Sequence, residues 1–192
     1  MIYTTLNKIF IHNPCADDWS KLLRHLNKGL PDDEPVDLLT ILESNGLDDA
    51  LWCLCAVDDF QREIRLYAVW CARQVQNFMP DQRSLEALDV AERHANGQAT
   101  DKDLAEARQE ARCAAIDAAR HGYKPYLPSI DAANHAAFHA TRADGSIAAR
   151  GAARDAARAL FWAGKGGWDE IRESQSAEFR RVAGVCAAGG VK

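Results

Sequence analysis

Apolar residues recur at intervals of three and four along nearly the whole chain, and strict alternation of apolar and polar residues is almost absent. An α-helix places residues three and four apart on one face, whereas a β-strand places alternate residues on one face. The sequence therefore predicts an all-α protein, an irregular helical bundle or stacked helical hairpins of about eight or nine helices.

Helix boundaries in the first third of the chain follow from glycine, proline and acidic residues. A first amphipathic helix is expected to end at Gly29, where glycine accepts the left-handed conformation. Pro35 is expected to be the first residue of a second helix, PVDLLTILES, which ends at Asn45 and Gly46. The next segment, LDDALWCLCAV, is apolar on nearly every side and is expected in the core. Near the amino terminus, TLNKIFIH fits a short helix and a strand equally well.

The middle of the chain predicts three further helices. The segment REIRLYAVWCARQVQNFM is amphipathic and is expected to be helical up to Pro80. Ser84 is the expected N-cap of the following helix. Thr100 and Asp103 resemble a capping box that opens a long alanine-rich helix ending at Gly122.

The last third is expected to contain one irregular stretch and three helices. Residues 122–130 hold two prolines and cannot continue a helix. Helices are expected at 130–142, from the Asp144–Gly145 break to Gly164, and at 168–187. We expect a single domain over residues 1–192, with an acidic part at 1–60, an alanine-rich part at 98–163 and the C-terminal helix at 168–187.

Charge is distributed unevenly along the chain, whose formal net charge is −5. Residues 1–60 carry eleven acidic and four basic side chains, whereas residues 151–192 carry five acidic and seven basic ones. A nucleic-acid binder usually concentrates lysine and arginine on one footprint, so this distribution favours a protein partner. No run of about 18 apolar residues and no secretory signal is present, which predicts a cytoplasmic protein that does not enter the membrane.

The cysteines and histidines give only weak signals for chemistry. Six cysteines are present without a CxxC pair, and most lie in apolar stretches, where a free cysteine acts as a small hydrophobic residue. His135 and His139 are four residues apart, a spacing that can seat a metal, with His121 and Cys113 near in sequence. The favoured interpretation is that these histidines cap, stack or face solvent, so no metal and no cofactor are expected.

Motifs for covalent or nucleotide chemistry are absent from the sequence. There is no GxSxG elbow, and the stretch AGKGGW lacks the spacing of a phosphate-binding loop and follows a helix instead of a strand. Acidic pairs such as Asp48 and Asp49 stand where they stabilise helix termini. We therefore expect no catalytic residue and no enzymatic activity.

Two charged stripes at helical spacing are the main candidates for binding. In one interpretation they pair with each other along a seam between neighbouring helices. In the other, the arginine stripe is open and meets carboxylates or phosphates of a partner. The acidic stripe is Asp103, Glu106, Glu110 and Asp117, and the basic stripe is Arg150, Arg154 and Arg158.

Aromatic residues in or beside the later loops are the second group of candidates. Aromatic anchors in loops suit protein interfaces. A tryptophan that opens a helix after glycines, as Trp168 does, can equally fasten that helix to its neighbour. The group comprises Tyr123, Tyr126, Phe161, Trp162 and Trp168, with Lys124 between the tyrosines.

Three motifs, NGLDDALW, AVWCARQV and ALDVAERHANG, resemble an alanine-rich family of bacteria and phages whose members carry an immunity-protein label. The resemblance covers about residues 43–121 and returns at residues 176–182, and the opening HNPCADDWSKLL is similar to members with a longer head. The chain departs from the family at residues 122–147, where GYKPYLPSIDAANHAAFHATRADGS replaces an array of Ala, Arg, Asp and Trp. The resemblance implies no catalytic residue.

These observations together predict a protein-binding inhibitor that acts by occlusion. It would be an immunity protein that blocks a toxin, or a phage protein that blocks a subunit of a host defence complex, as an anti-CRISPR does. The alternative is nucleic-acid or nucleotide binding through the arginine stripe with tyrosines stacking on bases. A metal-dependent enzyme built on His121, His135 and His139 is the third hypothesis, and homodimerisation stays open. The expected partner-binding residues are Arg150, Arg154, Arg158, Tyr123, Lys124, Tyr126 and Trp168.

Overall fold

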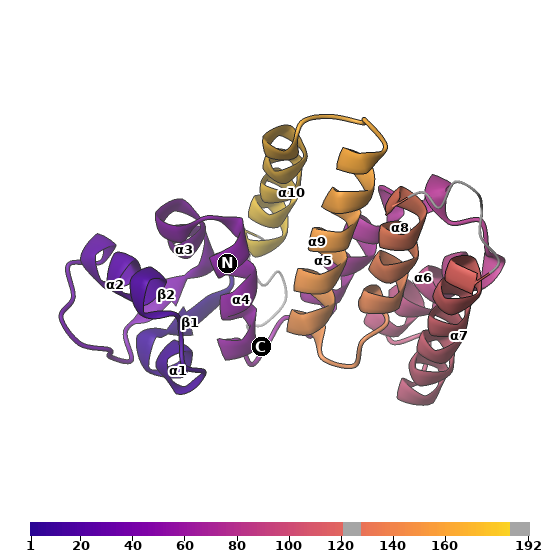
Figure 1. The fold of residues 1–192 in the computed structure, drawn as a ribbon. Helices are drawn as coiled ribbons and strands as arrows, with labels where there is room; N and C mark the ends of the chain where they lie inside the picture. Colours follow the sequence, from indigo (N-terminus) through magenta and orange to yellow (C-terminus); the bar gives the residue numbers. More distant parts are fainter. Residues whose placement is uncertain (121–127, 185–192) are drawn as a thin grey trace. The chain divides into compact units, whose positions relative to one another are not determined.

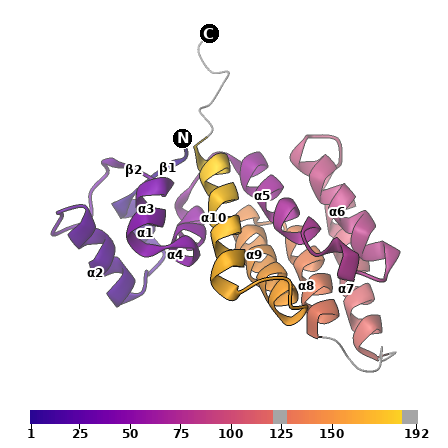
Figure 2. The ribbon, with the colours of Figure 1, turned by 90° about the horizontal axis from the view of Figure 1, so that it is seen from above.

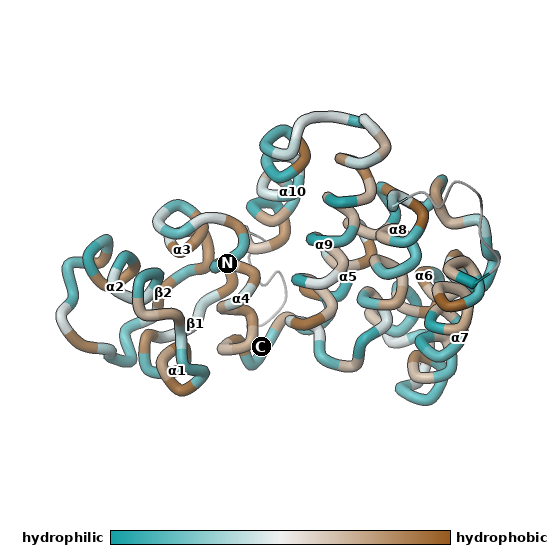
Figure 3. The backbone as a smooth tube through the Cα atoms, viewed as in Figure 1, coloured by the Kyte–Doolittle hydropathy of each residue, from teal (hydrophilic) through white to brown (hydrophobic). Residues whose placement is uncertain are grey.

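The computed structural model describes residues 1–120 and 128–184, and within these residues the chain forms ten α-helices, two short 3₁₀ helices and a two-stranded sheet (Figure 1). The all-α class predicted from hydrophobic periodicity is confirmed. Figure 3 shows hydrophobic and hydrophilic residues recurring along each helix, which is the pattern of helices with one buried face.

The chain divides into two units, which we describe separately. Unit 1 comprises Met1–Phe60 and Ser176–Lys192, and unit 2 comprises Gln61–Gln175. The boundary near the C-terminus falls within the last helix, α10 (Trp168–Ala183). The single domain expected from the sequence stays a prediction, which cooperative or stepwise unfolding would test.

Unit 1 combines a small sheet with four helices. Strand β1 (Tyr3–Thr5) pairs antiparallel with β2 (Pro35–Asp37), with Thr4 opposite Val36. The amino-terminal segment that fits helix or strand contains both, because the Thr5 hydroxyl accepts a hydrogen bond from Lys8 N and starts a helix directly after the strand. The helical elements are α1 (Leu6–Ile11), α2 (Ala16–His25), α3 (Leu38–Asn45), α4 (Leu47–Cys53) and the 3₁₀ helix η1 (Leu54–Ala56).

The start predicted for the second helix was wrong. Pro35 belongs to β2, where it lies opposite Thr5, and α3 begins three residues later. The Asp37 carboxylate accepts hydrogen bonds from the backbone N–H and the hydroxyl of Thr40, both at 2.8 Å, so Asp37 is the N-cap. The segment expected in the core is buried as predicted at Leu47, Ala50 and Leu51.

Unit 2 consists of two layers of helices. Figures 1 and 2 show α7, α8 and α9 side by side in one layer, with α8 in the middle, and α5 and α6 in the other. The beginning of α10 follows α9. The elements are α5 (Gln61–Arg73), the 3₁₀ helix η2 (Gln76–Phe78), α6 (Gln82–Ala95), α7 (Asp101–Arg120), α8 (Pro128–Ala140) and α9 (Gly145–Trp162).

Several boundaries in unit 2 differ from the prediction. Helix α5 ends at Arg73, so the helix expected up to Pro80 is interrupted before η2. Asp81, not Ser84, caps α6, because its carboxylate accepts a hydrogen bond from Arg83 N at 2.9 Å. Ser84 is buried inside α6 instead. Helix α8 begins at Pro128, two residues before the predicted start.

The capping box at the start of α7 is confirmed. Asp103 N donates a hydrogen bond to the Thr100 hydroxyl at 3.2 Å, and Thr100 N donates to the Asp103 carboxylate at 2.7 Å. The hydrogen bonds that the Asp103 carboxylate accepts from the backbone N–H and the hydroxyl of Thr100 lower the pKa of Asp103. The reciprocal pair satisfies donors that a helix otherwise leaves without partners in its first turn.

Alanine dominates the contact between α8 and α9. The small side chains let the two helix axes approach closely, as the alanine-rich composition predicts. The alanines with no exposed surface are Ala133, Ala136, Ala137 and Ala140 of α8 and Ala148, Ala149, Ala152, Ala153, Ala156, Ala157 and Ala159 of α9.

A buried arginine of α5 holds the connection from α8 to α9. Arg65 donates hydrogen bonds to the carbonyl oxygens of Ala140 at 3.2 Å, Arg142 at 2.7 Å and Ala143 at 2.8 Å. These carbonyls follow the last turn of α8, where the helix leaves acceptors without partners and where a cation is favoured. Burial lowers the pKa of Arg65.

Candidate functional site

The arginine stripe predicted from the sequence lies on the exposed face of α9. Arg150, Arg154 and Arg158 are each exposed, while the alanines between them are buried against the neighbouring helices. The alternative in which the stripe pairs with the acidic stripe of α7 is wrong for the described residues, because α8 lies between α7 and α9.

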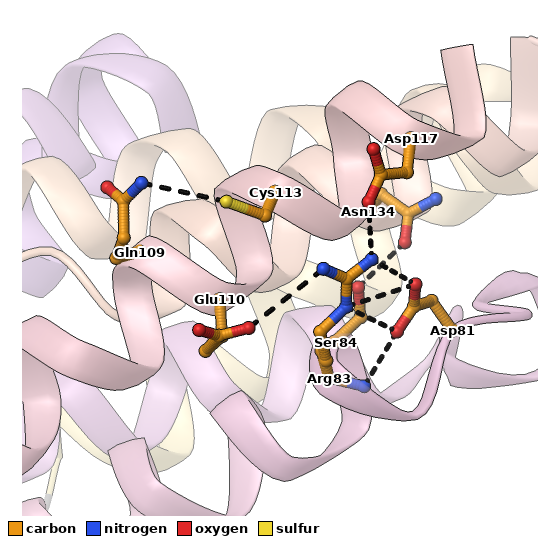
Figure 4. A network of polar contacts seen from close by, with 8 residues as sticks. All are labelled: Asp81, Arg83, Ser84, Gln109, Glu110, Cys113, Asp117 and Asn134. Carbon is orange, nitrogen blue, oxygen red and sulfur yellow. Dashed lines mark hydrogen bonds and ion pairs between the residues drawn. The ribbon is translucent and has the colours of Figure 1, made fainter. Parts of the chain in front are cut away.

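The acidic residues of α7 form ion pairs or hydrogen bonds with residues other than the arginines of α9. Asp117 lies 2.7 Å and Glu110 3.9 Å from the guanidinium of Arg83, which comes from α6 (Figure 4). Arg83 also pairs with Asp81 at 2.7 Å, and the carboxylates of Asp81 and Asp117 raise the pKa of Arg83. Glu106 pairs with Lys102 on its own helix at 3.7 Å. Two members of the acidic stripe, Glu110 and Asp117, therefore join α7 to α6, and among the residues that the structure describes none of the four pairs with the arginines of α9.

One buried carboxylate lies beneath two of the arginines. Asp155 is 3 % exposed, and its Oδ1 lies 3.6 Å from Arg154 Nε and 3.7 Å from Arg158 Nη1. Both guanidinium groups are thus drawn towards the same point on α9. The sequence analysis did not identify Asp155, although its position one residue after Arg154 and three before Arg158 was a readable signal.

The other oxygen of Asp155 faces a histidine of α8. His139 Nε2 lies 3.4 Å from Asp155 Oδ2. Burial lowers the pKa of His139 and outweighs the opposite effect of Asp155. The imidazole rests directly on Gly151, where a Cβ atom would be only 2.3 Å from the ring. This arrangement fixes the imidazole between the two helices, which is a structural role.

Three aromatic side chains continue the exposed face at the end of α9. Phe161 is 48 %, Trp162 44 % and Trp168 40 % exposed. The Arg158 guanidinium carbon lies 4.7 Å from the centre of the Trp162 ring, and Phe161 and Trp168 meet edge to face with ring centres 6.1 Å apart. We call Arg154, Arg158, Phe161, Trp162 and Trp168 the Arg–aromatic surface.

The turn after α9 brings the last of these rings into place. Lys165 N donates to Leu160 O at 3.0 Å and Gly164 N to Phe161 O at 3.1 Å, the paired bonds of a Schellman motif. Gly164 has φ +66°, which confirms its predicted role as the helix terminator. The chain then reverses and starts α10 at Trp168, against Phe161.

Three of the predicted partner-binding residues, Tyr123, Lys124 and Tyr126, lie outside the described residues, as does His121. Arg150, Arg154, Arg158 and Trp168 lie on α9 and at the start of α10 of unit 2. The structure adds Phe161 and Trp162 to them. These two rings were among the aromatic candidates of the sequence, but their contact with Trp168 and Arg158 depends on the turn.

The remaining candidates for chemistry are a metal site, the cysteines and His135. Within residues 1–120 and 128–184, no three His, Cys, Asp or Glu side chains are arranged to hold a metal ion. Cys53 and Cys71 are buried, and burial raises the pKa of Cys53. His135 is exposed. None of the helices in the described part of the chain is both long and apolar enough to cross a membrane.

Comparison of the chain with protein-family models, with curated proteins and with solved structures finds no match. The resemblance to immunity-labelled proteins is therefore still a prediction, and the Arg–aromatic surface has to be interpreted from its own chemistry.

Proposed function

We propose that this chain is a non-catalytic, protein-binding inhibitor of the immunity or anti-defence type, which blocks a partner protein by covering it with the Arg–aromatic surface. The observation that carries the proposal is the gathering of exposed arginines and three exposed aromatic rings on α9 and the start of α10. Trp, Tyr and Arg are the residue types most enriched among the side chains that dominate binding at protein interfaces.

The energetics of this surface favour binding. An exposed Phe or Trp side chain keeps apolar area in contact with water, and covering it contributes roughly 25 cal/mol for each Å². Arg158 is held over the Trp162 ring and beside Asp155, so it loses less conformational freedom when a partner binds. A preorganised arginine next to apolar anchors is the arrangement expected at the centre of an interface.

Buried polar groups of unit 2 serve the fold, which supports a binding role. Arg65 binds carbonyl oxygens between α8 and α9. Ser84 donates to the Asn134 side chain at 2.8 Å (Figure 4). Asn134 donates to Ile130 O at 3.0 Å. These hydrogen bonds join α5 to the connection between α8 and α9 and join α6 to α8, so these groups have a structural role.

A neutralisation assay tests the proposal. The full chain is expressed in bacteria with each member of a panel of bacterial toxins and host defence systems, and cell survival or phage plating is measured. The double variant Arg158→Ala, Trp162→Ala removes the centre of the surface, and Arg112→Ala, an exposed arginine of α7, is the matched control.

We expect the native chain and the Arg112→Ala variant to neutralise one member of the panel and to co-purify with one of its proteins, and the double variant to lose both properties. Neutralisation that persists in a folded double variant would contradict the proposed surface. Failure of the native chain to neutralise any system in its own host or phage background would contradict the proposed function.

A further inference from the structure

The spacing of the arginines defines the geometry of a matching ligand. Arg150, Arg154 and Arg158 follow one another at steps of four on α9. A helix rises about 1.5 Å per residue, so successive arginines are about 6 Å apart along the axis. Carboxylates one turn apart on a second helix repeat every 5.4 Å or so, which matches this distance.

The row carries an excess of positive charge. Two of its three guanidinium groups, those of Arg154 and Arg158, share one carboxylate, that of the buried Asp155. Within the described part of the chain Arg150 forms no ion pair. A ligand therefore meets uncompensated positive charge, most of all at Arg150, and an acidic ligand complements it.

The carboxyl-terminal end of the row continues into apolar side chains. Phe161 and Trp168 contact each other edge to face and leave nearly half of each side chain exposed. A ligand that runs along the arginines thus reaches an apolar anchor point about one turn beyond the last of them. An amphipathic helix offers both features, because it can present acidic residues in a row and an apolar residue at the next turn.

We infer that Arg150 and the Arg–aromatic surface bind an acidic amphipathic helix of a partner protein. Carboxylates at one-turn spacing pair with Arg150, Arg154 and Arg158, and one apolar side chain of the same helix packs against Phe161 and Trp168. The inference rests on the proposed function only in taking the partner to be a protein, and it specifies the partner's binding segment.

The ring geometry favours this ligand over a single-stranded nucleic acid. Bases bind aromatic side chains by stacking on open ring faces. One face of Trp162 is covered by Arg158, and the Phe161 and Trp168 rings stand at 85° to each other, so they do not form a stacking platform.

A peptide-binding measurement with the full chain tests the inference. The probe is a fluorescein-labelled, alanine-based peptide of about 18 residues, long enough to be partly helical in water, with glutamate at every fourth position and leucine one turn after the last glutamate. Two comparison probes are used. One is the same peptide with every glutamate replaced by glutamine, and the other is a labelled oligothymidine strand. Binding is followed by fluorescence anisotropy at low and at physiological salt.

We expect the glutamate peptide to bind at least about tenfold more tightly than the glutamine peptide, which corresponds to about 1.4 kcal/mol, and its affinity to fall as salt rises. The double variant Arg154→Ala, Arg158→Ala should lose about tenfold in affinity, whereas Arg112→Ala on α7 should change it by less than about twofold. The Trp168→Ala variant should bind both the glutamate and the glutamine peptide more weakly, because each peptide contains the leucine that packs against Trp168. All substituted side chains are exposed, so the variants should fold. Circular dichroism checks that they do.

Equal binding of the two peptides, unchanged binding by the folded double variant, or tighter binding of oligothymidine in the same buffer would each overturn the inference. These results are separable from the test of the proposed function. If the peptide binds but no toxin or defence system is neutralised, the inhibitory function is wrong and the helix-binding surface stands. If neutralisation depends on this surface but the peptide does not bind, the inhibitory function stands and only the inference that the ligand is an acidic helix is wrong.

Discussion

Replacing Gly151 by alanine is expected to destabilise the packing of α8 on α9, although alanine is the better helix former. The new Cβ atom would lie 2.3 Å from two atoms of the His139 ring and 2.8 Å from its Cβ. Ordinary van der Waals contact begins near 3.4 Å, so the rigid imidazole must move by about 1 Å. The ring is held between Gly151 and Asp155, and moving it disturbs the contact between His139 and Asp155.

The magnitude follows from two opposing effects. Overpacking a close-packed site costs about 1 to 3 kcal/mol, and the short distance to a rigid ring places this site at the upper end. Alanine in place of glycine within a helix contributes about 1 kcal/mol of stability. We therefore expect Gly151→Ala to lower the free energy of unfolding by about 2 kcal/mol.

A double-mutant cycle separates the two effects. In a His139→Ala background the ring is gone, so Gly151→Ala should raise the free energy of unfolding by up to about 1 kcal/mol. The coupling between the two positions is then about 3 kcal/mol. Urea denaturation followed by circular dichroism measures all four free energies. If Gly151→Ala changes stability equally in both backgrounds, the contact between Gly151 and His139 does not limit this packing.

Three further predictions concern stability. Arg65→Met should lower the free energy of unfolding by about 3 kcal/mol in urea denaturation, because it leaves three carbonyl oxygens between α8 and α9 without their charged donor. Thr100→Ala should cost about 1 kcal/mol in the same assay, since it removes the acceptor for Asp103 N. Burial lowers the pKa of His139, so the unfolded state binds a proton more readily than the folded state, and stability should fall as the pH drops below the ordinary histidine value of about 6.5. His139→Gln should reduce this loss, measured as urea-unfolding free energies between about pH 7 and pH 5.

The arginine and histidine predictions each have a matched control. Arg62→Met replaces an exposed arginine on α5 and should change stability much less than Arg65→Met. A His135→Gln variant removes an exposed histidine of α8 and should leave the pH dependence nearly unchanged. Equal effects of the two arginine variants, or equal pH profiles for the two histidine variants, would contradict the roles assigned to burial.

The helices were predictable because their signal is local and repeated. Apolar residues at helical spacing over ten or more positions outweigh single exceptions. The starts at Pro35 and Ser84 were mispredicted because Asp37 and Asp81 cap these helices, while Pro35 and Ser84 bind distant partners. Pro35 pairs with Thr5 of β1, and Ser84 binds Asn134 of α8, and neither contact is visible in the surrounding sequence.

For the candidate site, the sequence predicted the spacing of the arginines but not the residues that contact them. The steps of four between the arginines of α9 are a property of the sequence alone. Their freedom from the acidic stripe depends on α8 lying between α7 and α9, which is a matter of tertiary packing. The shared contact of Arg154 and Arg158 with Asp155 required side-chain positions on α9, and the placing of Trp168 against Phe161 required the reversal of the chain after Gly164.

Photo-cross-linking at the Arg–aromatic surface tests the central claim most directly. Benzoylphenylalanine, a photoreactive analogue of phenylalanine, is introduced at Phe161 or at Ile116, an exposed apolar position of α7, and cells of the native background are irradiated. We expect one discrete protein adduct from position 161, reduced by Arg158→Ala, and none from position 116. An adduct with nucleic acid, or a protein adduct at position 116 and none at 161, would contradict the account.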